Sequence, residues 1–578
     1  MRDVRNAITL AVLALAAFAL AACGQENADG GASKTPSDLV PRDAFFARPE
    51  VSTPLLSPDG RMISAVRPLD GVQNFFVAPV DDMTKWRAIT HFTDRDVNPT
   101  NVSGTLTHFW TPDSRYLVFL RDTNGNEKFH VMRADVATGE IVDLTPGENT
   151  RAVVCTRPAT FLGCELAARP DNTMLVGLYG VDPRFYDLYW LDIATGKTAL
   201  ALKNDRFIAF IADNAYEARI GITQENGGIA AYFRAQGGEW TLYKNYGPSG
   251  SPNRVINFDP ENKRLRVFSA DGRDKQALVE LDLDTRVETV IAEDDQVDLG
   301  NALVEPGTGK IQGYIRDFTR AELVVLDPAI QEDMDYLREA VDGELAILSR
   351  SADDKRWLLR FTFADAPQTL YLYERSPRKL TRLFSLTPAL EGLPLTKVHP
   401  IVTKSSDGFD LVSYYSLPRS ADPDQDGKGD RPVPLIVIIH GGPSDERARW
   451  TFAPILQWLN NRGYATLYVN FRGSPGFGKR FLEAQALEWG GKMNHDVDEQ
   501  VENLIRMGLV DPKRIAVFGG SYGGFATLTA ITRRPDLYAC AVAVVGPSNL
   551  ETFIANRPPE WPIEQMAVID RNVLRLAI

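Results

Sequence analysis

One serine has the surroundings that nucleophilic catalysis requires, in the run Gly519-Gly520-Ser521-Tyr522-Gly523. An apolar strand is predicted before it at 515–518, and a helix after it at 526–532. Strand, sharp turn and helix form a nucleophile elbow, which raises the serine hydroxyl above a sheet, and the flanking glycines permit the tight turn. The pattern predicts that Ser521 attacks a carbonyl carbon while the backbone N–H of Tyr522 stabilises the resulting oxyanion.

A glycine pair, Gly441 and Gly442, follows the continuous apolar run 435–439. Such a run is typical of a strand buried on both faces of a parallel sheet. Glycines just past the strand end let backbone N–H groups turn toward an oxyanion without a Cβ in the way. We therefore predict an oxyanion loop at this pair. The alternation of strands and helices after residue 396 predicts an α/β fold.

The base that Ser521 needs has no candidate in the usual place. Hydrolases of this fold carry their triad in the order Ser, then Asp or Glu, then His, and a free hydroxyl is a poor nucleophile. All six histidines precede the serine: His91, His108, His130, His399, His440 and His495. His440 could be proposed as a substitute, but its place in His-Gly-Gly-Pro suits the oxyanion loop better. The sequence predicts a C-terminally truncated or frame-shifted chain that lacks the triad acid and base and is nearly or wholly inactive.

The stretch before residue 396 repeats a tight turn followed by an alternating strand. Turns rich in Pro, Asp, Asn and Gly recur near positions 58, 112, 170, 213, 260, 306 and 353. A period of roughly 40–50 residues with several short strands per unit is typical of β-propeller blades. We therefore predict seven blades over 45–395. The alternative, an irregular β-sandwich, would not keep so even a spacing.

Chain length, net charge and one acidic loop indicate which partners and cofactors are to be expected. A chain of 578 residues is too long for one hydrophobic core, and its formal charge of −13 disfavours nucleic acid as a partner. The loop from Asp422 to Gly427 begins like a calcium loop, but Val433 stands where a bidentate Glu is required. It is predicted to be a solvated surface loop, so we expect no metal and no cofactor.

The N-terminus reads as an export signal. Arg2 and Arg5 precede an apolar run, which ends in Leu20-Ala21-Ala22-Cys23 and resembles the lipobox of bacterial lipoproteins. The resemblance implies a signal peptide over 1–22, lipidation of Cys23 and a polar tether over 23–44. An exported lipoprotein is then expected, which faces the periplasm or cell exterior and contacts the membrane only through its lipid. The alternatives are an uncleaved anchor or an ordinary signal peptide.

The other cysteines allow more than one interpretation. Cys155 and Cys164 could form a disulfide, since an exported protein sits where disulfides persist, or they could be small core residues. Cys540 falls inside an apolar run and is predicted to be buried packing.

Four motifs in this order resemble the prolyl oligopeptidase family, in particular its acylaminoacyl-peptidase and dipeptidyl-peptidase-like branch. They are His-Gly-Gly-Pro (440–443), Asn-Phe-Arg-Gly-Ser-Pro-Gly-Phe-Gly (470–478), Glu-Trp-Gly (488–490) and Gly-Gly-Ser-Tyr-Gly-Gly-Phe (519–525). Together with the blade spacing and the missing histidine, this resemblance predicts a seven-bladed β-propeller followed by an α/β-hydrolase domain over 396–578, incomplete at its C-terminus. It also implies a serine-type peptidase that hydrolyses short peptides through an acyl-enzyme, the propeller excluding folded proteins. A carboxylesterase and a non-catalytic lipoprotein that binds through its propeller are the alternatives.

Overall fold

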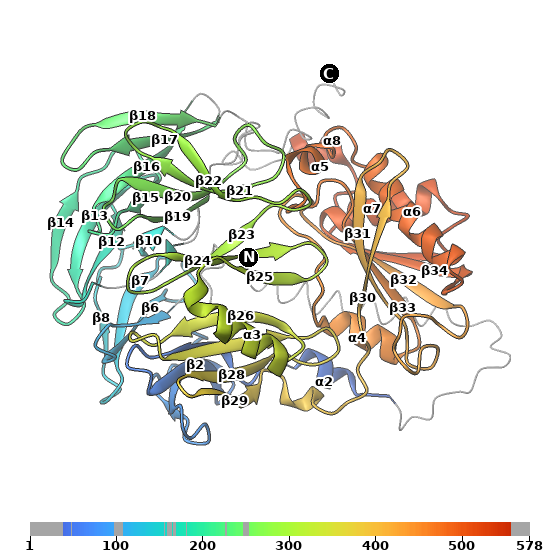
Figure 1. Cartoon of the computed structure of the whole chain (residues 1–578), viewed down its shortest axis with the longest axis horizontal. Coiled ribbons are helices and arrows are strands. Elements are labelled where there is room, and N and C mark those ends of the chain that lie inside the picture. The colour runs from blue at the N-terminus through green and yellow to red at the C-terminus, as the bar shows by residue number, and fades with distance from the viewer. Residues whose placement is uncertain are drawn as a thin grey trace.

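The computed structural model describes residues 39–47, 49–97, 108–154, 157–158, 164–165, 169–180, 182–225, 228–246 and 254–555 of the chain. Two bodies lie side by side in Figure 1: a ring of small sheets, coloured blue to yellow, and an α/β body in orange and red. The ring precedes the α/β body in the chain, in the predicted order.

The ring is a seven-bladed β-propeller in the part of the chain that the structure describes, so the predicted blade count is confirmed. Blades one to four comprise β1 (Ser52–Leu56), β2 (Met62–Leu69), β3 (Val72–Pro79), β4 (Arg87–Ala88); β5 (His108–Trp110), β6 (Tyr116–Arg121), β7 (His130–Asp135), β8 (Ile141–Asp143); β9 (Ala152–Val154), β12 (Thr173–Tyr179), β13 (Tyr186–Asp192), β14 (Thr198–Leu202); and β15 (Ala209–Ala212), β16 (Ala218–Glu225), β17 (Gly228–Arg234), β18 (Trp240–Asn245). Blades five to seven comprise β19 (Arg254–Phe258), β20 (Arg264–Ser269), β21 (Ala277–Asp282), β22 (Glu288–Ala292); β23 (Gly300–Val304), β24 (Ile311–Asp317), β25 (Ala321–Val325); and β26 (Glu344–Arg350), β27 (Arg356–Thr362), β28 (Thr369–Arg375), β29 (Arg378–Ser385). The short pair β10 (Arg157–Pro158) and β11 (Cys164–Glu165) is inserted in blade three.

Each predicted turn directly precedes the second strand of its blade. In three blades a hydroxyl donates a hydrogen bond to the aspartate two residues later: Ser57 to Asp59 (2.6 Å), Thr111 to Asp113 (2.6 Å) and Ser351 to Asp353 (2.7 Å). The same turns contain a residue in the left-handed region, namely Gly60, Ser114 and Asp354. Glycine and short polar residues tolerate that conformation, which explains why the turns were visible in the sequence.

The ring closes through side chains and turns, since each blade is built from one contiguous stretch of chain. Where blade seven meets blade one, the Ala352 N–H donates to Pro58 O at 2.7 Å and the Arg356 guanidinium donates to Gly60 O at 2.9 Å. Leu56 of blade one and Leu358 of blade seven share a buried cluster across this junction. Hydrogen bonds and side-chain packing therefore close the ring, and no strand from one end of the propeller completes the blade at the other end among the described residues.

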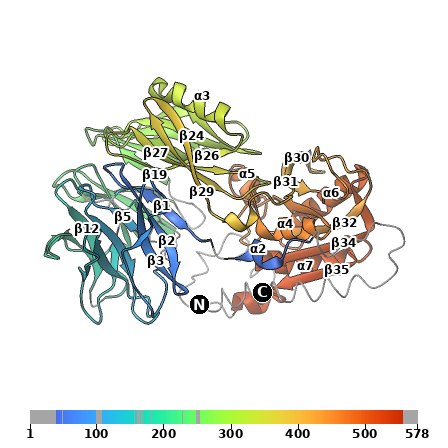
Figure 2. The same ribbon diagram turned by 90° about the horizontal axis from the view of Figure 1, so that it is seen from below.

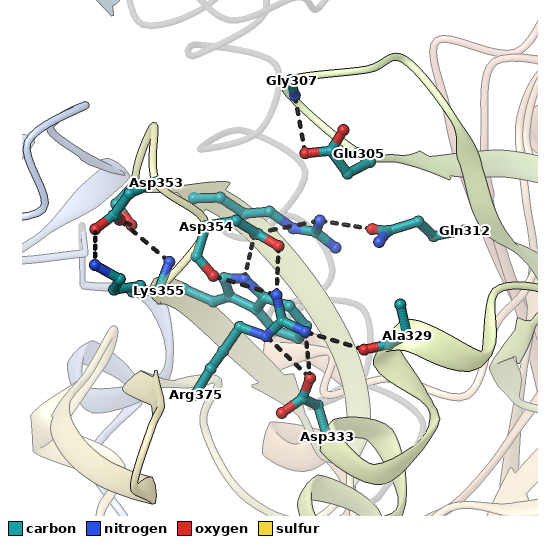
Figure 3. Close-up of polar contacts among 12 residues, drawn as sticks. Glu305, Gly307, Gln312, Ala329, Asp333, Asp353, Asp354, Lys355 and Arg375 are labelled. Atoms are coloured by element: carbon teal, nitrogen blue, oxygen red, sulfur yellow. Dashed lines mark hydrogen bonds and ion pairs between the residues drawn. The ribbon is translucent and has the colours of Figure 1, made fainter.

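Blade six has three strands among the described residues, and α3 (Gln331–Ala340) follows it on the periphery of the propeller (Figure 2). Arg375 of blade seven holds this helix, because its guanidinium contacts the carboxylate of Asp333 in α3 at 2.8 Å (Figure 3). The same guanidinium contacts Asp354 of its own blade at 2.6 Å. In the same network Arg350 of blade seven donates to Gln312 of β24 at 2.7 Å. These contacts fix blade six, and β24 in particular, to blade seven.

The α/β body contains a six-stranded sheet within the described residues, in the order β30-β31-β33-β32-β34-β35, and confirms the predicted α/β-hydrolase fold. Its strands are β30 (His399–Lys404), β31 (Asp410–Ser416), β32 (Val433–Ile439), β33 (Ala465–Val469), β34 (Val510–Gly520) and β35 (Cys540–Val544). The four strands β33, β32, β34 and β35 pair in parallel, whereas β31 is antiparallel to both of its neighbours, β30 and β33. The continuous apolar run around Val437 is buried, as a strand covered on both faces must be.

The helices of this body are α4 (Pro454–Asn461), α5 (Lys479–Glu483), α6 (Lys492–Arg506), α7 (Tyr522–Arg533) and α8 (Leu550–Ala555). The short helix α2 (Arg42–Phe46) precedes the first blade but packs on α4, beside which it lies in Figure 2. There the Val40 N–H donates to Asn461 at 3.0 Å, and Arg462 donates to Val40 O at 2.9 Å. The chain thus contacts the α/β body before it enters the propeller.

Several predicted features lie outside the described residues: the signal peptide over 1–22, Cys23, Cys155 and the side chain of Cys164. Cys540 is half-buried rather than buried, because β35 is the last strand of the described sheet. None of the described helices is both long enough and apolar enough to span a membrane.

Candidate active site

Ser521 occupies the turn between β34 and α7, where it is exposed to solvent. Its backbone has φ 56° and ψ −122°, a strained conformation for a residue with a Cβ. Its N–H donates to Val544 O at 2.9 Å, which ties the turn to the neighbouring strand β35. The helix begins at Tyr522, four residues earlier than the sequence predicts, so it follows the serine directly. Strand, strained serine and helix have the geometry of a nucleophile elbow.

Steric contacts explain why glycines stand on either side of Ser521. A Cβ on Gly519 would lie 2.3 Å from Gly523 O, and a Cβ on Gly523 would lie 2.1 Å from Ile439 O. Both distances are far inside van der Waals contact. A Cβ on Gly520, in contrast, would meet nothing closer than Val544 O at 3.9 Å. Two of the three glycines are therefore needed for the close approach of β34, α7 and the end of β32.

The predicted oxyanion loop lies beside the elbow. Since β32 and β34 are parallel neighbours, Ile439 pairs with Gly519 and both chains leave the sheet at the same edge. A Cβ on Gly441 would lie 3.5 Å from the Cβ of Ser521. The structure thus brings Gly441 next to Ser521, with Gly442 following at φ 104°. Their service as oxyanion donors, like that of the Tyr522 N–H, stays a prediction.

His440 holds the loop. One ring nitrogen lies 2.8 Å from the hydroxyl of Ser474, the other lies 2.8 Å from Gly441 O, and the ring stacks on Phe471 with centroids 4.3 Å apart. Burial lowers the pKa of His440 to about 4. Since both ring nitrogens are occupied by the loop and its neighbours, the arrangement argues against His440 as a substitute base.

The other histidines lie in other parts of the fold. His91 follows β4 and is exposed, His108 and His130 are in blade two, His399 starts β30, and His495 of α6 contacts Arg533 at 2.8 Å. Among the residues that the structure describes, no hydrogen bond joins a histidine to Ser521.

A cluster of aromatic side chains next to Ser521 was not predicted. The buried ring of Tyr522 packs against Trp489 at 4.7 Å and against Phe471 at 5.5 Å between centroids. Each ring comes from a different motif, so the motifs meet in space. The available signal was that each of the three motifs contains at least one large aromatic residue.

An ion-paired arginine supports the same region. Arg472 follows Phe471 and is buried, and its guanidinium donates to Asp496 (2.7 Å) and Asp407 (2.9 Å). The hydrogen bonds from Arg472 hold the pKa of Asp407 well below its ordinary value. This network ties the strand end at Phe471 to α6 and to the β30–β31 turn.

The loop that begins like a calcium site brings three carboxylates together, those of Asp422, Asp424 and Asp426. Asp422 is buried rather than solvated, because its carboxylate accepts the N–H groups of Asp426 and Gly427, each at 3.1 Å. Val433 is buried at the start of β32 and supplies no ligand. Backbone N–H groups of the loop thus occupy the carboxylate of Asp422.

A propeller joined to an α/β body with a nucleophile elbow defines a two-domain hydrolase. The family model that matches residues 450–570 is that of the prolyl oligopeptidase family. Dipeptidyl aminopeptidase BIII of Pseudoxanthomonas mexicana is 39% identical over 561 residues, which cover 95% of this chain and 78% of that protein. Dipeptidyl peptidase family member 6 of Caenorhabditis elegans is 31% identical over 555 residues, or 91% of this chain and 73% of that protein. The chain therefore belongs to the prolyl oligopeptidase family of serine peptidases.

Solved structures agree on the fold. A puromycin-hydrolyzing peptidase of Mycobacterium tuberculosis superposes with a TM-score of 0.66 at 16% identity, covering 92% of this chain and 82% of that one. An acylaminoacyl peptidase in complex with Z-Gly-Gly-Phe-chloromethyl ketone superposes with a TM-score of 0.62 at 17% identity, covering 92% and 83%.

Proposed function

We propose that this site hydrolyses short peptides through an acyl-enzyme on Ser521, with the amide of Tyr522 and the loop of Gly441 and Gly442 around the oxyanion. The observation that carries the proposal is the strained serine at φ 56° with Gly441 against its Cβ. Peptides are favoured over esters as substrates because the relatives that match almost the whole chain are named as dipeptidyl peptidases.

We further propose that Ser521 has no histidine base among the residues that the structure describes, so that these residues alone support little activity. His440 is engaged by Ser474 and Gly441 O, and no hydrogen bond joins another described histidine to Ser521. An added base such as imidazole should then restore part of the reaction, because general-base catalysis contributes typically 10²–10⁴-fold.

The experiment compares the chain with Ser521→Ala on dipeptidyl p-nitroanilides and on p-nitrophenyl esters, with imidazole supplied as base. We expect amide hydrolysis that the Ser521→Ala chain lacks. Ester hydrolysis alone would favour the carboxylesterase, and saturable peptide binding without turnover of either substrate would favour a non-catalytic binding protein.

The location of the chain is a separate proposal, supported by the Leu20-Ala21-Ala22-Cys23 segment. Export should remove residues 1–22 and lipidate Cys23, so that the mature protein partitions into the membrane fraction. Intact-mass analysis of the exported protein measures both changes, and Cys23→Ser serves as the control. A mature protein that retains residues 1–22 or carries an unmodified Cys23 would contradict the lipoprotein proposal.

A further inference from the structure

The hairpin of β24 and β25 in blade six reaches from the propeller to the α/β body (Figure 1). Three backbone or ring contacts are made at its tip. Phe318 O accepts from the guanidinium of Arg447 at 3.2 Å, Thr319 O accepts from the Tyr414 hydroxyl at 3.0 Å, and the Arg320 guanidinium lies 4.0 Å from the Trp450 ring centroid. Arg447 and Trp450 both lie in the segment that follows the predicted oxyanion loop.

The last residue of β24, Asp317, faces two arginines of that segment. Its carboxylate lies 3.1 Å from Nε of Arg449 and 3.8 Å from Nη2 of Arg447. The Arg447 side chain is only 3% exposed, so its charge requires a nearby anion. Among the described residues, Asp317 is the carboxylate that forms an ion pair with Arg447. The propeller therefore supplies the countercharge of a buried arginine in the α/β body.

Arg447 is enclosed from the other side as well. Its guanidinium lies 4.2 Å from the ring centroid of Phe477, and a Cβ on Gly476 would lie 2.5 Å from its Nη1. The glycine at 476 thus leaves the space that the arginine fills. Phe477 and Gly476 therefore border Arg447 on the side away from Asp317, and they limit the space into which it could move.

The distance along the chain from this arginine to the loop is short. Four residues, Pro443 to Glu446, separate Gly442 from Arg447. Since each residue spans at most about 3.6 Å, Arg447 is joined to the loop by a short stretch of chain, through which a shift of Arg447 can act on the loop. The other end of the loop is held by His440, which contacts Ser474. The glycine pair is therefore held on one side by His440, whose contacts lie inside the α/β body, and on the other by Arg447, whose ion pair comes from the propeller.

We propose that Asp317 is a positioning residue for the oxyanion loop, so that the loop has its productive geometry beside Ser521 only while blade six is docked. This inference rests on the proposed function, in which the loop surrounds the oxyanion. The hairpin can serve as a fixed reference because β24 is itself held to blade seven by the contact of Gln312 with Arg350.

A second contact between the two bodies provides a matched control. The Asp274 carboxylate of blade five accepts the N–H of Arg480 at 2.7 Å, and the Asp298 carboxylate accepts the N–H of Gly478 at 3.1 Å. Asp274 is 30% exposed and Asp317 is 20% exposed, so the two carboxylates are similarly placed at the interface. Asp274 contacts the segment at 478–480 and not the loop.

Hydrogen–deuterium exchange of the full chain, read by mass spectrometry, tests the proposal. Asp317→Ala should speed amide exchange over 440–449 about tenfold, because opening a segment becomes easier when it loses a buried ion pair. Asp317→Glu should restore most of the protection, and Asp317→Asn, which keeps the size of the side chain, should not. Asp274→Ala should speed exchange over 478–482 and leave 440–449 unchanged.

Modification of Ser521 by a fluorophosphonate in imidazole buffer provides the second readout. Asp317→Ala should lower the maximal rate of modification about tenfold. The probe concentration that gives the half-maximal rate should change little, because the loop stabilises the transition state more than the bound probe. Asp317→Glu should recover this rate. Unchanged exchange over 440–449 in Asp317→Ala, or equally faster exchange over the whole chain, would overturn the positioning role. A parent chain whose Ser521 stays unmodified would instead count against the proposed function, and exchange would still decide the role of Asp317.

Discussion

Replacement of Gly523 by alanine is expected to destabilise the α/β-hydrolase body by about 3 kcal/mol or more, at the upper end of what overpacking costs. The added methyl would lie 2.1 Å from Ile439 O, and a carbonyl inside a parallel sheet cannot move away without breaking the ladder between β32 and β34. Urea unfolding followed by tryptophan fluorescence measures the change in the free energy of unfolding.

Gly520→Ala is the control for this prediction. It changes the same type of residue three positions earlier, where the nearest atom to the new methyl is 3.9 Å away. We expect a change within about 1 kcal/mol, as for a substitution that creates no clash. Equal destabilisation by the two substitutions would contradict the steric account of the elbow.

The second large effect concerns the proposed lack of a base beside Ser521. The 578-residue chain is expected to hydrolyse dipeptidyl p-nitroanilides with a kcat/KM at least about 10⁴-fold below that of the Pseudoxanthomonas mexicana relative measured beside it, since loss of a triad member typically has an effect of that order. Without the base, the hydroxyl of Ser521 keeps its proton and attacks slowly.

Ser521→Ala supplies the reference for this comparison, because it should lower the remaining rate of the chain only slightly in the absence of imidazole. Ser521-dependent hydrolysis within about 100-fold of the relative would mean that another group in this chain acts as the base, and the inactivity proposal would be wrong.

The features that were predictable from sequence are those encoded locally. The blade turns were visible because Ser57 with Asp59, and its counterparts in other blades, form their hydrogen bonds within a few residues. Ser521 was visible because the steric demand of the elbow selects glycines at fixed offsets from it. The hydrogen bonds of the turns and the close approach of Gly519 to Gly523 O act over fewer than six residues, so they leave a pattern in the sequence.

The features that could not be predicted depend on distant pairs. Asp317 and Arg449 are 132 residues apart, and neither stands in a distinctive local pattern. The docking of α3 on Arg375 and the burial of Asp422 are of the same kind, since both depend on which neighbour the fold supplies. The aromatic contact of Trp489 with Tyr522 is intermediate, because its residues stood in recognised motifs but their meeting required the fold.

The most consequential proposal is that Ser521 is the nucleophile and has no base beside it in this chain. The most direct measurement is incubation of the purified chain with a fluorophosphonate, with and without imidazole, followed by peptide mapping of the modified residue by mass spectrometry. We expect a single adduct on Ser521 that forms slowly in plain buffer and faster with imidazole, and no adduct on that peptide in Ser521→Ala. An adduct on a different residue, with Ser521 unmodified in the presence of imidazole, would contradict it.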